Sequence, residues 1–205
     1  MSLKLIHFPL TRSLRVAWAV FELGLDVEIE TRPYDHAKLK EPEYLALHPL
    51  GKTPVLFDDG KRIIESIAII EYLSKKYANG ALSRNPQNAD YADYLMWMEF
   101  GEAGMGGYAG QLIGHVVLLP EAQRSETMRA WAENELANCF RLLEDNLQGK
   151  DYLLGEFSLA DISVGYILFL TKLARHGHMM GPNVAGYFHR LTERDAWKQA
   201  NALKP

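Results

Sequence analysis

The feature that most constrains the fold is a change of sequence pattern near residue 80. Before that point, short runs at 3–6 and 26–31 have the length and apolar content of strands. Between them, apolar residues recur at i, i+3, i+4 and i+7 over residues 14–21, which marks one face of a helix, and Gly24 supplies a stop. A strand, a helix and a strand in this order predict a βαβ unit with a right-handed crossover.

The segment that follows predicts a β-hairpin and a further helix. Residues 55–57 and 63–64 are apolar and flank the turn Asp58-Asp59-Gly60-Lys61, which is typical of a hairpin. A helix with one buried face then opens at Ser66. Residues 1–80 are therefore expected to form a small α/β domain with the order βαβ-ββα.

After this domain the chain reads as a linker followed by helices. Residues 81–88 are polar and rich in turn-forming residues. Residues 89–117 and 121–147 are expected to form two long helices with a break at Leu119-Pro120. We therefore expect an all-helical domain over residues 89–205.

One helix of this domain is expected to be central. Ser158-Leu159-Ala160-Asp161 resembles a capping box, and it stands directly before an apolar run from Ile162 to Leu170. A helix that is apolar on all sides is buried in a protein core or in a membrane, and this run is far shorter than the ~20 residues of a membrane span.

The composition narrows the class of function. Lys and Arg total 22 against 26 Asp and Glu, a net charge of −4, so there is no electrostatic reason to expect a nucleic acid or an anionic membrane as partner. No signal peptide is visible. The single cysteine, Cys139, excludes a disulfide framework and a multi-cysteine zinc site. We expect a cytoplasmic globular protein.

The loop over residues 9–16, between the first strand and the first helix, could hold an anion. The hydroxyl groups of Thr11 and Ser13 lie beside a helix N-terminus, with Arg12 and Arg15 nearby. Hydroxyl donors and the partial positive charge of the helix end favour an anion, including a thiolate. Capping of the helix by Thr11 or Ser13 would explain the same residues.

The pair Thr53-Pro54 stands where a sheet tolerates proline, at the start of a strand. In the cis form, the backbone groups of Thr53 could face solvent and pair with a peptide-like ligand. The local sequence alone favours an ordinary trans proline.

Glu65-Ser66 opens the second helix. Ser66 as N-cap would leave a helix end that binds a carboxylate, and Glu65 could pair with an ammonium group. A zwitterionic ligand end would match both, although a plain helix cap is the simpler interpretation.

The order and spacing of these motifs resemble the cytosolic glutathione transferase family over nearly the whole chain. Thr11–Trp18 followed by Glu22–Leu25 is similar to the first-helix signature of bacterial and fungal members, and His48–Leu56 is similar to the segment with the family's cis-proline. Glu65–Ile69 matches its Glu-Ser motif, and Phe157–Ile162 resembles the capping box of its buried helix. The resemblance implies a thioredoxin-like N-terminal domain and an all-helical C-terminal domain.

The resemblance also implies a glutathione site. Glu65 and Ser66 would hold the γ-glutamyl ammonium and carboxylate groups. The backbone of Thr53, positioned by Pro54, would pair with the cysteinyl part, and Lys52 would meet the glycyl end.

The implied chemistry is activation of the glutathione thiol. Thr11 stands four residues before Arg15, where related sequences place the hydroxyl that hydrogen-bonds the thiol. A free thiol titrates near ~8.5, so such a donor would raise the thiolate fraction for attack on a small hydrophobic electrophile. Ser is more usual than Thr at this position, and Ser13 is a rival donor. His7 falls where tyrosine-type members carry their catalytic phenol, although a structural role is favoured for it.

The electrophile site is the least defined part. Each glycine inside a helix costs ~1 kcal/mol relative to alanine, so the six within one expected helix predict a bend, a break or close packing. They are Gly101, Gly104, Gly106, Gly107, Gly110 and Gly114. Trp97, Met105 and Tyr108 are candidate wall residues of the electrophile site, although core packing is favoured for Trp97.

The resemblance thus implies a glutathione S-transferase that acts in detoxification, with glutathione as co-substrate, and no metal is expected. His176, His178 and His189 lack the carboxylate or cysteine that would complete a metal site. The resemblance implies a homodimer, which the glycine-rich helix would suit. Two alternatives stay open: glutathione-dependent reduction of peroxides or disulfides, and a transferase-like protein that binds glutathione or another partner without catalysing transfer.

Overall fold

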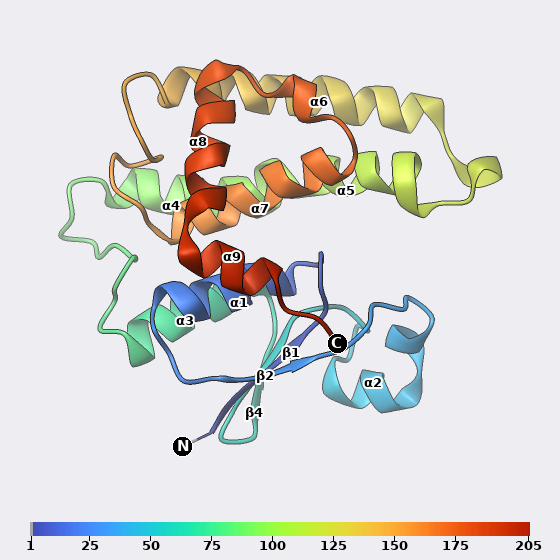
Figure 1. Ribbon diagram of the computed structural model, residues 1–205, viewed down its shortest axis with the longest axis vertical. Coiled ribbons are helices and arrows are strands. Elements are labelled where there is room, and N and C mark those ends of the chain that lie inside the picture. Colours follow the sequence, from blue (N-terminus) through green and yellow to red (C-terminus); the bar gives the residue numbers. More distant parts are fainter. Residues whose placement is uncertain (1) are drawn as a thin grey trace. The chain divides into compact units, whose positions relative to one another are not determined.

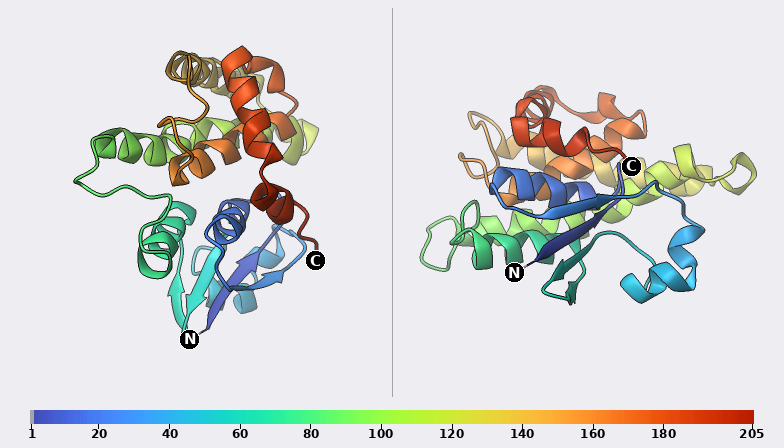
Figure 2. Two further views of the ribbon diagram at one scale, coloured as in Figure 1. Left: turned by 60° about the vertical axis from the view of Figure 1, so that its left-hand side comes forward. Right: turned by 60° about the horizontal axis from the view of Figure 1, so that its bottom comes forward.

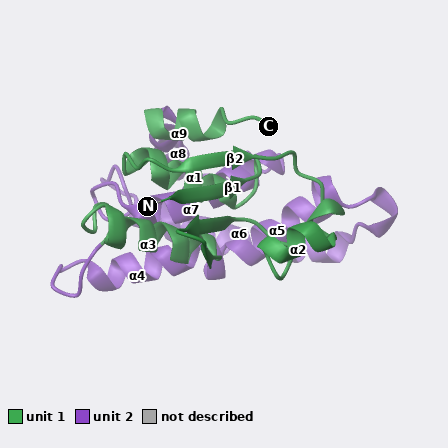
Figure 3. Cartoon of the chain, turned by 90° about the horizontal axis from the view of Figure 1, so that it is seen from below, with its two compact units in different colours: residues 1–83, 194–205 green, residues 84–193 purple. Residues whose placement is uncertain are grey.

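The computed structural model describes residues 2–205, which divide into two compact units (Figure 3). Unit 1 extends to Ser83 and includes residues 194–205, and unit 2 comprises residues 84–193. The sequence pattern placed residues 194–205 in the helical domain. In the structure they belong to unit 1, because the last helix, α9, packs against the first, α1.

Unit 1 has the expected element order around a four-stranded sheet (Figure 1). Its elements are β1 (Leu3–His7), α1 (Ser13–Glu22), β2 (Glu28–Thr31), a 3-10 turn (Lys38–Lys40), α2 (Pro42–Leu47), β3 (Val55–Asp58), β4 (Lys61–Ile63), α3 (Ser66–Tyr77) and α9 (Asp195–Asn201). The strand order is β2-β1-β3-β4, with β1 and β2 parallel and the other pairs antiparallel. The predicted βαβ-ββα order is therefore confirmed.

The inner strands β1 and β3 of this sheet are mostly buried, whereas the edge strands β2 and β4 are more exposed. Leu5 and Ile6 point to opposite faces, since successive strand residues alternate, and neither has appreciable exposed surface. On one face, Ile6 joins a cluster with Phe8, Tyr44 and Val55 that ties the sheet to α2. Helices α1 and α3 pack against each other and cover the other face (Figure 2).

The described residues of unit 2 form helices and their connections. These elements are α4 (Tyr91–Glu99), a π-helical turn (Phe100–Gly104), α5 (Gly106–Ile113), a second π-helical turn (Gly114–Leu118), a 3-10 turn (Glu121–Gln123), α6 (Glu126–Asn146), α7 (Leu159–Leu173), a 3-10 turn (Gly177–Met179) and α8 (Pro182–Glu193). In residues 2–205, no helix is long and apolar enough to cross a bilayer.

The helix expected over residues 89–117 is interrupted by the two π-helical turns, as the glycine content predicted. Gly101 also shows close packing, because a Cβ atom there would lie 2.3 Å from Ser163 Oγ on α7. The second long helix begins at Glu126 rather than at 121. Ser125 caps it by accepting a hydrogen bond from the Met128 N–H at 3.3 Å.

The capping box before α7 is confirmed. Asp161 accepts from the backbone N–H of Ser158 at 2.8 Å and of Leu153 at 3.0 Å, and from the Tyr187 hydroxyl at 2.9 Å. Nearly every residue of α7 is buried, as its apolar sequence predicted. Burial also raises the pKa of Asp161, so its hydrogen-bond donors are what make a carboxylate tolerable there.

Candidate functional site

The loop between β1 and α1 gathers hydroxyl groups around Thr11. Thr11 Oγ1 donates to the Phe8 carbonyl at 2.8 Å and lies 2.9 Å from Ser13 Oγ. It also accepts from Thr53 Oγ1 at 2.8 Å, which ties the loop to the entry of β3. Thr11 and Thr53 are half-buried, so both keep surface that a ligand can reach.

Ser13 and His7 form the buried side of this cluster. Neither has exposed surface. Ser13 Oγ accepts from the Phe8 N–H at 2.9 Å and lies 2.9 Å from His7 Nδ1. Burial lowers the pKa of His7 to about 4, so its ring is neutral at neutral pH. Ser13, predicted as a rival donor to the thiol, lacks the surface that direct contact requires. The structural role favoured for His7 agrees with its burial.

Ser13 is not a helix cap, whereas Thr11 caps the first turn of α1 in part, because its Oγ1 accepts from the Ser13 N–H at 3.3 Å. Helix α1 begins at Ser13 itself, and Arg12 at its N-cap position makes no capping hydrogen bond with its side chain. The Ser13 hydroxyl contacts the end of β1 instead, and the Thr11 hydroxyl contacts Phe8 and Thr53. The two hydroxyl groups therefore form hydrogen bonds that join β1, α1 and the entry to β3.

The entry to β3 lies directly beside this junction. The Thr53–Pro54 peptide bond is cis, as the family resemblance implied and against the trans form that the local sequence favoured. The Tyr44 hydroxyl donates to the Lys52 carbonyl at 2.7 Å and fixes the preceding residue. The Lys52 side chain is exposed, which leaves its ammonium group available to an anion.

The start of α3 differs from the prediction in one detail. Ser66 is the first helical residue, and Glu65 occupies the N-cap position without a capping hydrogen bond from its side chain. Glu65 is exposed and has φ 73° and ψ 111°, a conformation that costs a non-glycine residue ~1–3 kcal/mol. Such backbone strain is concentrated at functional sites, and here it stands beside the N–H groups at the start of a helix, which have no partner within the helix.

Arg15 is the residue of this region that the sequence did not place. It is fully buried on α1, and its Nη1 donates to Ser66 Oγ at 3.2 Å. A buried guanidinium group requires hydrogen-bond partners, and this one links α1 to the start of α3. The apolar period of this helix did not signal the burial, because Arg15 lies about 100° around the helix from Leu14 and outside the apolar face.

The three candidate wall residues for an electrophile lie in unit 2 and differ in exposure. Trp97 and Met105 are 2% and 0% exposed and belong to the core, so they present no surface to a substrate. The Trp97 ring packs edge-on against Phe100, which agrees with the core packing that was favoured for it. Tyr108 is half-buried and packs edge-on against Trp131, which is 46% exposed.

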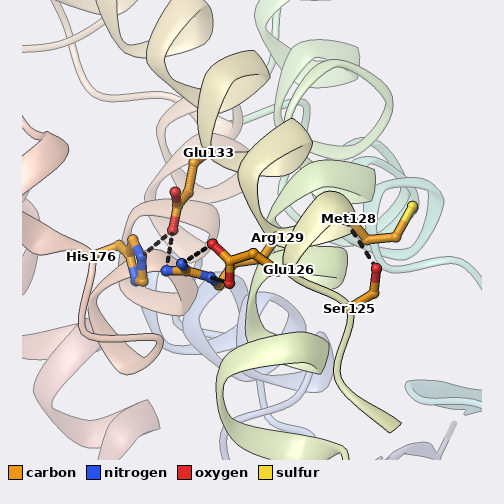
Figure 4. Close-up of polar contacts among 6 residues, drawn as sticks. All are labelled: Ser125, Glu126, Met128, Arg129, Glu133 and His176. Atoms are coloured by element: carbon orange, nitrogen blue, oxygen red, sulfur yellow. Dashed lines mark hydrogen bonds and ion pairs between the residues drawn. The ribbon is translucent and has the colours of Figure 1, made fainter.

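His176 belongs to a polar cluster on unit 2 (Figure 4). Its Nε2 lies 2.8 Å from Glu133 Oε1, which also accepts from Arg129 at 3.0 Å. Arg129 pairs in addition with Glu126. Within residues 2–205, no three His, Cys, Asp or Glu side chains are grouped so that they could hold a metal ion.

Comparison with known proteins identifies both halves of the chain. Residues 1–75 match the family model for the glutathione S-transferase N-terminal domain, and residues 113–197 match that for the C-terminal domain. Glutathione S-transferase 3 from Zea mays is 31% identical over 211 residues, which cover 99% of this chain and 95% of the maize protein. Elongation factor 1-gamma from Prunus avium is 33% identical over 168 residues, which cover 78% of this chain and 38% of that protein.

Solved structures agree with these matches. A glutathione transferase from Burkholderia graminis, determined with two glutathione molecules bound per subunit, has a TM-score of 0.83 and 26% sequence identity. The alignment covers 98% of this chain and 87% of that one. With both domain models matched and a relative similar over nearly its full length, the chain belongs to the glutathione S-transferase family.

Proposed function

We propose that this protein is a glutathione S-transferase of the Ser/Thr type, in which the Thr11 hydroxyl stabilises the thiolate of bound glutathione. The observation that carries the proposal is the position of this hydroxyl. It is the accessible member of the cluster at the end of β1, 2.8 Å from Thr53 Oγ1 and beside the cis-proline Pro54. The glutathione bound in the B. graminis relative supports glutathione as the ligand.

Unit 1 offers a complementary group for each part of glutathione. The exposed Glu65 carboxylate suits the γ-glutamyl ammonium group. The free N–H groups at the start of α3, beginning with Ser66, suit its carboxylate. The backbone of Thr53, ahead of Pro54, suits the cysteinyl amide in the manner of an added strand, and Lys52 suits the glycyl carboxylate.

The reaction follows from the thiol chemistry. A free thiol titrates near ~8.5, and each unit by which the site lowers its pKa corresponds to ~1.4 kcal/mol of preference for the thiolate. The thiol proton passes to solvent, and the thiolate accepts a hydrogen bond from Thr11 Oγ1. The sulfur then attacks an electrophilic carbon of a small hydrophobic compound. A C–S bond forms as the leaving group departs with its bonding electron pair, and the chain supplies no covalent nucleophile.

Substitutions at Thr11 test this mechanism against a role for Ser13. Thr11→Ala should raise the pKa of the bound thiol by about one unit and slow conjugation at least about tenfold, because it removes one charge-assisted hydrogen bond. Thr11→Ser keeps the donor and should retain activity. The thiol pKa is read from the ultraviolet absorbance of the thiolate. If Thr11→Ala changes neither the thiol pKa nor turnover, the mechanism is wrong.

A second candidate function is binding without transfer. Two observations favour it: the Thr11 hydroxyl donates to the Phe8 carbonyl here, and the chain is similar to Elongation factor 1-gamma as well as to transferases. In that case glutathione, if it binds, would keep the thiol pKa of the free peptide. The titration that tests Thr11 therefore also separates the two candidates.

A cytoplasmic homodimer is the assembly that we propose for this function. Leu95 and Met96 on α4 are 46% and 45% exposed, and adjacent exposed apolar side chains suit an interface between copies. Light scattering of the wild type and of Met96→Lys tests it: a dimer that the lysine weakens supports the assembly, and a wild-type monomer refutes it. Tyr108, which keeps exposed surface, is the remaining candidate for the electrophile wall.

A further inference from the structure

The proposed function gives no role to the buried imidazole of His7, which adjoins the hydroxyl cluster at Thr11. Its Nε2 has no hydrogen-bond partner, and its Nδ1 lies 2.9 Å from Ser13 Oγ. A buried polar atom without a partner is rare enough in proteins to require an explanation. Ser13 Oγ is in turn 2.9 Å from Thr11 Oγ1, so His7 is one hydroxyl removed from the group that faces the ligand.

The hydrogen bonds of Ser13 cannot all form at once. Its Oγ lies 2.9 Å from each of four polar atoms: the Phe8 nitrogen, the Phe8 oxygen, His7 Nδ1 and Thr11 Oγ1. A hydroxyl group donates one hydrogen bond and accepts two. The Phe8 N–H already fills one of the accepting positions. Ser13 Oγ keeps one proton to donate and one lone pair to accept with. Their partners depend on which ring nitrogen of His7 is protonated.

If Nδ1 carries the proton, His7 donates to Ser13 Oγ and fills its second accepting position. Ser13 then donates to the Phe8 carbonyl, because Thr11 Oγ1 already accepts from Thr53 Oγ1 at 2.8 Å and from the Ser13 N–H at 3.3 Å, and Thr11 cannot donate to Ser13. The Phe8 carbonyl also accepts from the Thr11 backbone N–H at 3.3 Å. The Thr11 hydroxyl proton can consequently turn toward a ligand without leaving this carbonyl unpaired.

If Nε2 carries the proton, Nδ1 accepts the Ser13 proton instead. The Phe8 carbonyl then depends on the Thr11 hydroxyl as its side-chain donor, at 2.8 Å, and the Thr11 proton is held inward. The two forms also differ at Nε2 itself. The first leaves an unused lone pair there, and the second leaves a buried N–H without an acceptor, which is the rarer defect among backbone groups.

We propose that His7 is a positioning residue: as the Nδ1–H tautomer it donates to Ser13, and Ser13 thereby releases the Thr11 hydroxyl proton to a bound thiolate. The low pKa of the buried ring agrees with a neutral imidazole that carries a single N–H at neutral pH. The effect on the thiol rests on the proposed function, whereas the tautomer can be tested without any ligand.

The tautomer is measured first, on the ligand-free protein with 15N-labelled histidine. The two ring nitrogens of a neutral imidazole have distinct 15N shifts when protonated and when bare. His7 is assigned by comparison with the variant His7→Asn. We expect the protonated nitrogen to be Nδ1. A protonated Nε2 overturns the inference, whether or not the protein binds glutathione.

The second measurement is the pKa of the bound glutathione thiol in matched variants. An asparagine amide lies where Nδ1 of histidine lies, and a glutamine amide lies nearer the position of Nε2. His7→Gln and His7→Phe should therefore raise the thiol pKa by about one unit, which is about tenfold less thiolate at neutral pH, and His7→Asn should not. His48, a second buried histidine, supplies the control His48→Asn, which should match the wild type.

These variants separate positioning from simple packing. Glutathione affinity at a pH where the thiol is protonated should be equal in the Asn and Gln variants, because the rest of the site is unchanged. If the two variants shift the thiol pKa equally, or if His7→Phe does not shift it, the inference is wrong. A wild-type protein that binds no glutathione refutes the proposed function instead, and the 15N spectrum still decides the hydrogen-bond arrangement. The Asn and Gln pair suffices if the Phe variant does not fold.

Discussion

Replacing Gly101 by alanine should destabilise the helical unit, although alanine is the better helix former. Gly101 lies in the first π-helical turn, where it packs against α7. A Cβ atom there would lie 2.3 Å from Ser163 Oγ, 2.6 Å from its carbonyl carbon and 2.7 Å from its carbonyl oxygen. Two of these three atoms belong to the backbone, so the clash cannot be relieved by a rotamer change of Ser163.

The expected magnitude combines two opposing effects. Overpacking of a core costs ~1–3 kcal/mol, and contact with backbone atoms places Gly101→Ala near ~3 kcal/mol. The substitution also threatens the buried hydrogen bond from Ser163 Oγ to the Met98 carbonyl, at 2.7 Å. Better helix propensity offsets ~1 kcal/mol. The net loss is then ~2 kcal/mol, which lowers Tm by ~4–8 °C in a chain of this length.

Two other glycines of the same region supply controls. A Cβ atom at Gly107 or Gly110 would meet no heavy atom within 4 Å. Gly110→Ala should therefore stabilise the unit by ~1 kcal/mol, and Gly107→Ala by somewhat less, because it lies at the start of α5. Thermal and urea unfolding of the three variants measures the difference. If Gly101→Ala proves as stable as Gly110→Ala, the argument that close packing selects glycine at 101 fails.

Three further predictions concern buried charges and protons. Asp161→Asn should lower the free energy of unfolding by at least ~3 kcal/mol, because backbone N–H groups and the Tyr187 hydroxyl lose their ionic acceptor. A loss under ~1 kcal/mol, measured by urea unfolding, would contradict this. Burial lowers the pKa of His7 to about 4, so the free energy of unfolding should fall by up to ~3 kcal/mol as the pH drops from 6.5 to 4. The difference in unfolding free energy between the wild type and His7→Asn isolates this effect, and a difference that does not change with pH refutes it. Glu22→Gln should lower the free energy of unfolding by ~2 kcal/mol, because it weakens the two hydrogen bonds from Arg194, at 2.6 and 2.7 Å. Unfolding of the single and double variants should show that the two side chains are coupled, and additive effects would contradict the prediction.

The sequence predicted those parts of the fold that depend on local pattern. The period of the first helix, the Asp58–Lys61 turn and the capping box at Ser158 each act within a few residues, and each is confirmed. Helix α9 meets α1 instead through contacts between residues far apart in the chain: the Trp18 and Trp197 rings, whose centroids are 4.8 Å apart, and the bond between Glu22 and Arg194. No periodicity indicates such contacts, so the sequence pattern did not place residues 194–205 beside α1.

The residues of the candidate site also divide into those that a local motif indicated and those whose place depends on distant contacts. Thr11, Thr53, Glu65 and Ser66 were named from motifs, and the structure brings the first two into contact through their hydroxyl groups. The burial of Arg15 beneath Ser66 was not predicted, because it requires α1 and α3 to lie side by side. The capping interpretation failed for Ser13, and holds only in part for Thr11, for a related reason. A Ser or Thr before a helix is a good N-cap in isolation, but here the end of β1 competes for the same hydroxyl groups.

The choice between Thr11 and Ser13 shows why spacing alone could not define the site. The two residues are alike in chemistry and two positions apart, so a motif accepts either. Ser13 is the first residue of α1, and its side chain turns back onto the Phe8 backbone and loses all exposure. Thr11 precedes the helix and keeps an open side. Because a thiolate can be stabilised only by a donor it can reach, helix register rather than residue type is the reason that we propose Thr11 for the contact with the ligand and Ser13 for the positioning of its proton.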